Sequence, residues 1–115
     1  MSDRWEAAYP PVDLYEEGDE VVVEAELPGV DPDDVRVELT DHHLVIQGEV
    51  RRTREHHDGG IYRQERHFGS FVRTVPLPAE VDLDRADATF RGGVLQLRLP
   101  RKAGRRRRLP IRREP

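Results

Sequence analysis

The sequence contains no cysteine, only one lysine and no long apolar run. Without cysteine the chain can form no disulfide, thiolate metal site or cysteine nucleophile, and a reducing compartment suits it. No stretch approaches the roughly 18 apolar residues of a membrane span. Residues 1–9 also lack the apolar run of a signal peptide. These absences favour a soluble, cytoplasmic protein.

Residues suited to catalysis are equally scarce. Ser2 and Ser70 are the only serines, and the lone lysine, Lys102, lies close to the C-terminus. The sequence has no glycine-rich phosphate loop and no paired catalytic motif. Its many carboxylates fall in expected turns and on polar strand faces, where solvation explains them. We therefore expect a protein that is not an enzyme and needs no cofactor.

Charge is distributed unevenly along the chain. Residues 1–100 carry 11 arginines and 22 acidic residues, whereas residues 101–115 carry eight basic residues and one acidic residue. A basic run such as Arg105–Arg108 attracts nucleic acid electrostatically. Here no aromatic residues are interleaved with it, and the body of the chain is acidic. We therefore interpret the run as a solvated linker and expect neither a nucleic-acid nor a membrane partner.

Apolar and polar residues alternate with the period of a β-strand in many short segments. We count eight candidate strands, near residues 12–14, 21–27, 35–40, 44–46, 61–63, 71–75, 86–90 and 95–99. Short strands at regular intervals in a chain long enough for one domain are typical of a sandwich or barrel.

Glycine, proline and aspartate mark the expected turns. Pro28-Gly29 ends the second strand, and turns follow at 31–34 and 82–84. Gly48 is expected to close the hairpin of the third and fourth strands. Gly92-Gly93 predicts a tight hairpin, because both glycines tolerate positive φ. Residues 49–60 are almost wholly polar and predict a long loop.

Four stretches in order carry a family resemblance. They are Glu26-Leu27-Pro28-Gly29-Val30, Leu44–Glu49, Glu65–Arg73 with the following Leu77-Pro78, and Ala88–Leu95 with the following Leu99-Pro100. Together they closely resemble the α-crystallin domain of the small heat-shock proteins, in its bacterial and plant form, over about residues 10–100. The resemblance implies an all-β, immunoglobulin-like sandwich of seven or eight strands. It also implies an ATP-independent holdase chaperone that binds unfolding client proteins in the stress response.

The same resemblance divides the chain into an arm (1–10), the domain (11–100) and a basic C-terminal extension (101–115). It implies a homodimer in which a strand near Ile61, within the loop of residues 49–67, pairs with a neighbouring subunit. Tyr62, Glu65 and Arg73 would lie at that interface, with Arg73 paired to an acidic loop residue, Glu55 or Glu65.

The C-terminal extension contains Leu109-Pro110-Ile111, which matches a tripeptide that docks on another dimer in this family. In an extended chain Leu109 and Ile111 point to the same side, and Pro110 stiffens the segment. Burying both side chains contributes on the order of 3–6 kcal/mol before entropic costs. We expect the tail, and clients competing with it, to bind a groove between two edge strands, lined by Val35, Val37, Leu39, Ala86, Ala88 and Phe90.

The arm that precedes the domain is short in this sequence. Trp5 and Tyr9 are its main apolar residues and are expected to contact clients. We therefore expect a dimer or modest oligomer rather than a large cage. The alternative function is an interaction adaptor or co-chaperone with an α-crystallin-like domain and no general holdase activity.

Two histidine pairs, His42-His43 and His56-His57, have the chemistry of metal ligands. The sequence shows no carboxylate or cysteine set that completes a coordination geometry, and adjacent histidines on a strand point in opposite directions. We expect exposed turn histidines and no metal site.

Overall fold

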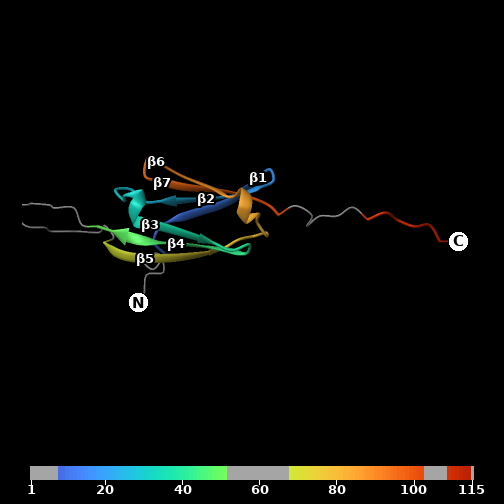
Figure 1. Cartoon of the computed structure of the whole chain (residues 1–115), viewed down its shortest axis with the longest axis horizontal. Helices are drawn as coiled ribbons and strands as arrows, with labels where there is room; N and C mark the ends of the chain where they lie inside the picture. The colour runs from blue at the N-terminus through green and yellow to red at the C-terminus, as the bar shows by residue number, and fades with distance from the viewer. Residues whose placement is uncertain (1–7, 52–67, 103–108, 115) are drawn as a thin grey trace, which may run out of the picture.

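The computed structural model describes residues 8–51, 68–102 and 109–114 (Figure 1). In these ranges the chain forms strands β1 (Val12–Glu17), β2 (Glu20–Glu26), β3 (Val35–Leu39), β4 (His43–Val50), β5 (Gly69–Pro76), β6 (Asp87–Arg91) and β7 (Val94–Pro100). Two short 3₁₀ turns, η1 (Pro32–Asp34) and η2 (Leu83–Arg85), precede β3 and β6. No helix among these residues has the length and apolar character needed to cross a membrane.

The strands form two antiparallel sheets packed as two layers (Figure 1). One sheet has the order β1-β2-β7-β6, and the other has the order β3-β4-β5. The predicted all-β sandwich is thus confirmed, and seven of the eight predicted strands are present. The eighth, near residues 61–63, lies outside the described residues.

The core fills the space between the two sheets. Alternate residues of the central strands point into it, as the period of two requires. Fully buried members include Val21 and Val23 of β2 and Leu44 and Ile46 of β4, each with no exposed surface. Each such side chain contributes about 1.5–3 kcal/mol through its removal from water.

A contact made by the residues just before β1 shows which edges of the two sheets lie on the same side of the sandwich. The ring of Tyr9 packs edge-on against that of Phe71 on β5, with centroids 5.3 Å apart and planes at 78°. The β5 edge of the three-stranded sheet therefore lies on the same side of the sandwich as β1. The remaining edges, β3 and β6, share the opposite side.

Short polar side chains and glycines form the turns at the predicted positions. Asp31 accepts a hydrogen bond from the backbone N–H of Asp33 at 2.9 Å and caps η1. Asp82 caps η2 in the same way, by accepting from Asp84 at 3.0 Å. The β6–β7 hairpin turns on Gly92-Gly93 with φ values of 59° and 80°, as that pair predicts.

Gly48 does not close the β3–β4 hairpin, and that prediction was wrong. Strand β4 continues through it to Val50, which is only 6% exposed. The glycine is needed for space: a Cβ at this position would lie 2.4 Å from the carbonyl oxygen of Asp34 and 3.1 Å from the ring of Phe71. The residue marks a close approach of backbones inside the sheet.

We expect Gly48→Ala to lower the free energy of unfolding by about 1–3 kcal/mol, because the added methyl overpacks a site bounded by backbone. Chemical denaturation of the variant checks this. Glu49→Ala, an exposed change at the next position of β4, is the control and should shift stability by less than about 0.5 kcal/mol. Equal stability of Gly48→Ala and the parent chain would contradict the proposed close approach.

Candidate polypeptide-binding edges

Strand β3 presents a row of apolar side chains at one sheet edge. Val35, Val37 and Leu39 lie opposite Gly48, Ile46 and Leu44 of β4 and face the core with them. Because β3 has one neighbour, β4, among the strands that the structure describes, all three are half-buried although they pack against the core. Its other side carries the unpaired backbone groups of an edge strand, which can pair with an added chain.

Strand β6 presents a second such row at the corresponding edge of the other sheet. Ala88 lies opposite Leu97, and Phe90 lies opposite Leu95, so both face inward. Phe90, like Ala86 just before the strand, is half-buried against the core, whereas Ala88 is exposed. The six residues predicted to line a groove therefore form two inward-facing rows on one side of the sandwich. Binding in that groove remains a prediction.

The β1 edge lies on the other side of the four-stranded sheet. Its Leu14 and Tyr15 are 40% and 38% exposed, and among the described strands β1 pairs only with β2. This edge could therefore accept a strand from a partner. The residues expected to pair across a dimer, Ile61, Tyr62 and Glu65, lie outside the described residues.

Arg73 lies between Phe71 and Val75 on the core-facing row of β5, opposite Ile46. A guanidinium in such a row must find acceptors, because an unpaired buried charge is costly. Its Nη1 donates to the carbonyl oxygens of Ala8 at 2.8 Å and Pro10 at 2.7 Å. Within one chain, Arg73 thus fastens the arm to the β5 edge.

This role of Arg73 escaped the sequence analysis, because its acceptors are backbone carbonyls that no motif marks. The expected interface partner Glu65, like Glu55, lies outside the described residues. The interface role of Arg73 therefore remains a prediction beside the observed one. The available signal was the position of Arg73 between two inward-facing apolar residues, because an arginine there must bind hydrogen-bond acceptors from a neighbouring segment.

Arg51 fastens the start of the long loop to the sandwich. Its Nε and Nη2 each donate to a carboxylate oxygen of Asp34 at 3.0 Å. Hydrogen bonding and the charge of Asp34 raise the pKa of Arg51 above its usual value. Since arginine is protonated throughout the physiological range in any case, the raised pKa does not change the charge of Arg51, and the contact serves to orient the chain.

The expected docking residues of the tail are open to solvent. Leu109 and Ile111 are 70% and 95% exposed, so within one chain neither side chain is buried. Of the two expected client contacts, Trp5 lies outside the described residues. Tyr9 is half-buried against the core, so contact with a client would require its release from Phe71.

The comparisons with known proteins agree with these features. A sequence model of the Hsp20/alpha crystallin family matches residues 13–112. The chain belongs to this family. It is 44% identical over 94 residues to heat shock protein 16 of Schizosaccharomyces pombe, covering 80% of this chain and 66% of that protein. It is 34% identical over 93 residues to small heat shock protein C4 of Rickettsia felis, covering 81% and 57%.

Solved structures show the same fold. Heat shock protein 16.0 from Schizosaccharomyces pombe superposes with a TM-score of 0.71 at 40% identity, covering 90% of this chain and 97% of that chain. A small heat-shock protein from Xylella fastidiosa, described as having a distinct high order structure, gives 0.70 at 37% identity, covering 93% and 99%. The predicted family is therefore confirmed.

Family membership shows the general class of activity. Small heat-shock proteins are chaperones of the stress response and not enzymes, so the prediction that this chain is not an enzyme is confirmed. The chain spans only 57% to 66% of the length of the two curated relatives named above. The details of activity and partners are therefore matters for proposal.

We expect Arg73→Met to lower the free energy of unfolding by about 1.5–3 kcal/mol, since it removes charge-assisted hydrogen bonds to two carbonyls. Methionine keeps the apolar stem that packs in the inward row. Chemical denaturation measures the change. Arg36→Met, at an exposed arginine of β3, is the matched control and should alter stability by less than about 0.5 kcal/mol. Equal effects of the two substitutions would show that Arg73 does not fasten the arm.

Proposed function

We propose that this chain is an ATP-independent holdase that binds unfolding proteins at the β3 and β6 edges and limits their aggregation. The observation that supports this most strongly is the pair of inward-facing apolar rows at these edges. All of these residues except Ala88 already contact the core, yet they remain only half-buried. An extended, apolar segment could add backbone hydrogen bonds to an edge and place alternate side chains over the rows.

The C-terminal tail is the internal counterpart of such a segment. Leu109 and Ile111 have the spacing that places two side chains on one face, and both are exposed. In our proposal the tail of one copy docks on the β3–β6 side of another, and clients compete for the same place. One docked tail binds weakly, so several act together through multivalency.

The β1 edge would serve a different contact. We propose that the segment near Ile61 and Tyr62 of one subunit pairs with this edge in a second, producing a homodimer. The exposed Leu14 and Tyr15 support this, because they belong to a strand whose outer side pairs with none of the described strands. The absence of cysteine fits a reducing location such as the cytoplasm.

The second candidate function is an adaptor that binds specific partners without general holdase activity. The packing of Tyr9 against Phe71 favours it, because that ring is engaged within the chain. An adaptor would give no protection to an unrelated heat-aggregating protein at equimolar amounts. A holdase would reduce its light scattering without ATP.

Ala88→Glu tests the proposed binding side. Ala88 is exposed and faces inward on β6, so a carboxylate there meets water in the unbound chain and becomes desolvated beneath a bound client. We expect roughly tenfold weaker client binding, about 1.4 kcal/mol, read as a higher concentration needed to suppress light scattering.

Thr89→Glu is the matched control. Thr89 is also exposed on the same strand, but it lies opposite Gln96 and points to the outer face. It adds the same charge and should leave protection unchanged. Equal loss of protection in both variants would indicate a general effect of charge and would contradict binding at the inward row. Full protection by Ala88→Glu would do the same.

A further inference from the structure

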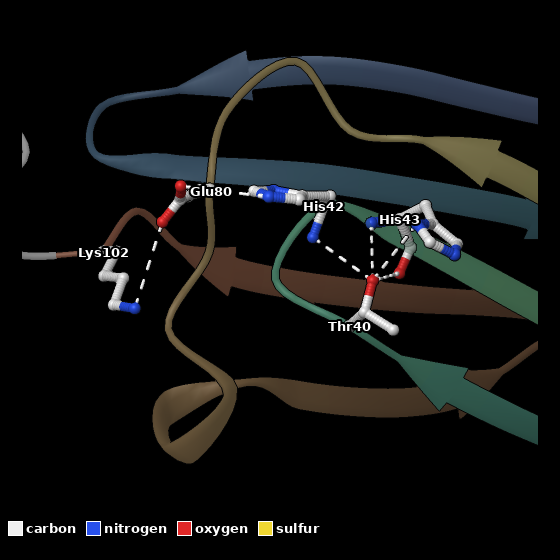
Figure 2. Close-up of polar contacts among 5 residues, drawn as sticks. All are labelled: Thr40, His42, His43, Glu80 and Lys102. Carbon is white, nitrogen blue, oxygen red and sulfur yellow. Dashed lines mark hydrogen bonds and ion pairs between the residues drawn. The ribbon is translucent and has the colours of Figure 1, made fainter.

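Three side chains with the chemistry of metal ligands meet at one end of the sandwich. Asp41 and His42 lie in the β3–β4 turn, and Glu80 lies in the connection from β5 to β6. One ligand atom from each lies within 4.8 Å of the other two. Figure 2 shows the imidazole of His42 directed toward the carboxylate of Glu80, and its Nε2 lies 4.0 Å from Glu80 Oε1.

The backbone holds the two loops in register. The N–H of Leu77 donates to the carbonyl of His42 at 2.9 Å, and the N–H of Val81 donates to that of Asp41 at 3.1 Å. Val81, next to Glu80, is 1% exposed and is therefore fixed in the core. The two loops that carry the three ligands are thus already joined by backbone hydrogen bonds, which lowers the entropic cost of bringing the ligands together.

The cluster is also accessible and close to a coordinating geometry. The side chain of His42 is 65% exposed, while that of Glu80 is 17% exposed. Around a tetrahedral ion with bonds of about 2.0–2.2 Å, ligand atoms lie roughly 3.4 Å apart. A rotation of the exposed imidazole that moves its Nε2 by well under one bond length brings this atom to that distance from Glu80 Oε1.

We propose that Asp41, His42 and Glu80 bind a zinc ion. One imidazole nitrogen and two carboxylate oxygens suit a borderline ion such as Zn²⁺, whereas Mg²⁺ and Ca²⁺ prefer oxygen ligands throughout. No metal site was predicted at His42-His43, because the sequence shows no carboxylate or cysteine set that completes a coordination geometry there. The fold supplies the carboxylate of Glu80 from a distant loop.

A cation already contacts this cluster. Lys102 Nζ lies 3.9 Å from Glu80 Oε2 (Figure 2), and the N–H of Lys102 donates to the carbonyl of Glu80 at 3.0 Å. Lys102 begins the stretch that leads to the tail. Its ammonium competes with zinc for Glu80, so bound zinc would free this side chain. The site therefore couples zinc to the base of the C-terminal extension.

Calorimetric titration of the full chain with ZnCl₂ tests the site. We expect one ion per chain at this site and an affinity that falls about tenfold or more in His42→Ala. His43→Ala is the matched control. The imidazole of His43 is next to His42 in the chain, but it contacts Thr40 Oγ1 at 3.2 Å and lies outside the cluster. That variant should bind zinc as the parent does. Glu80→Gln, a nearly isosteric change, should weaken binding as His42→Ala does.

Lys102→Met gives a readout of opposite sign. Removing the competing ammonium should tighten zinc binding severalfold, whereas Arg113→Met, which removes one positive charge from the exposed tail, should not. Zinc affinity that is unchanged in His42→Ala and Glu80→Gln, or equally reduced in His42→Ala and His43→Ala, overturns the proposal. The first result would place the bound ion elsewhere, for example at the His56-His57 pair, and the second would show that the loss comes from disturbing the β3–β4 turn and not from removing a ligand.

Discussion

Unpaired backbone at the edges of two short, open sheets is the constraint on which this structure depends. The seven strands of the described residues form a sandwich that does not close into a barrel, which leaves an edge at each end of each sheet. On one side, the arm covers part of the β5 edge through the Arg73 hydrogen bonds and the Tyr9–Phe71 contact. On the other side β3 and β6 stand together with half-covered apolar rows. The proposed chaperone function uses that second side.

The core strands and the C-terminal tail share one sequence pattern, in which every second residue is apolar. In the central strands, inward residues such as Val21 and Ile46 are completely buried, whereas the inward rows of the edge strands are only partly covered. The difference is the number of neighbouring strands and not the residue type. Leu109 and Ile111 carry the same alternating pattern into the extension, where the single chain leaves both exposed. The chain thus contains both a half-covered surface and a segment that suits it.

The sequence predicted features that depend on local chemistry. Seven strands, the Asp31 and Asp82 turns and the Gly92-Gly93 hairpin were all predictable, since each depends on period-two alternation or on the φ preference of a few residues. Gly48 was misread because its role depends on Asp34 and Phe71, which approach it only in the folded sheet. The contacts of Arg73 with two carbonyls, and of Glu80 with His42, were missed for the same reason. Each joins segments that are distant in the chain.

Hydrogen exchange tests the central claim that the β3 and β6 edges receive extended chain. Amide exchange would be compared among the full chain, a chain ending at Pro100 and a full-length Leu109→Ala/Ile111→Ala variant. The account predicts slower exchange in the full chain, confined to β3 and β6, and the loss of this protection in both altered chains. Identical exchange in all three, or protection that lies only on other strands, would contradict it.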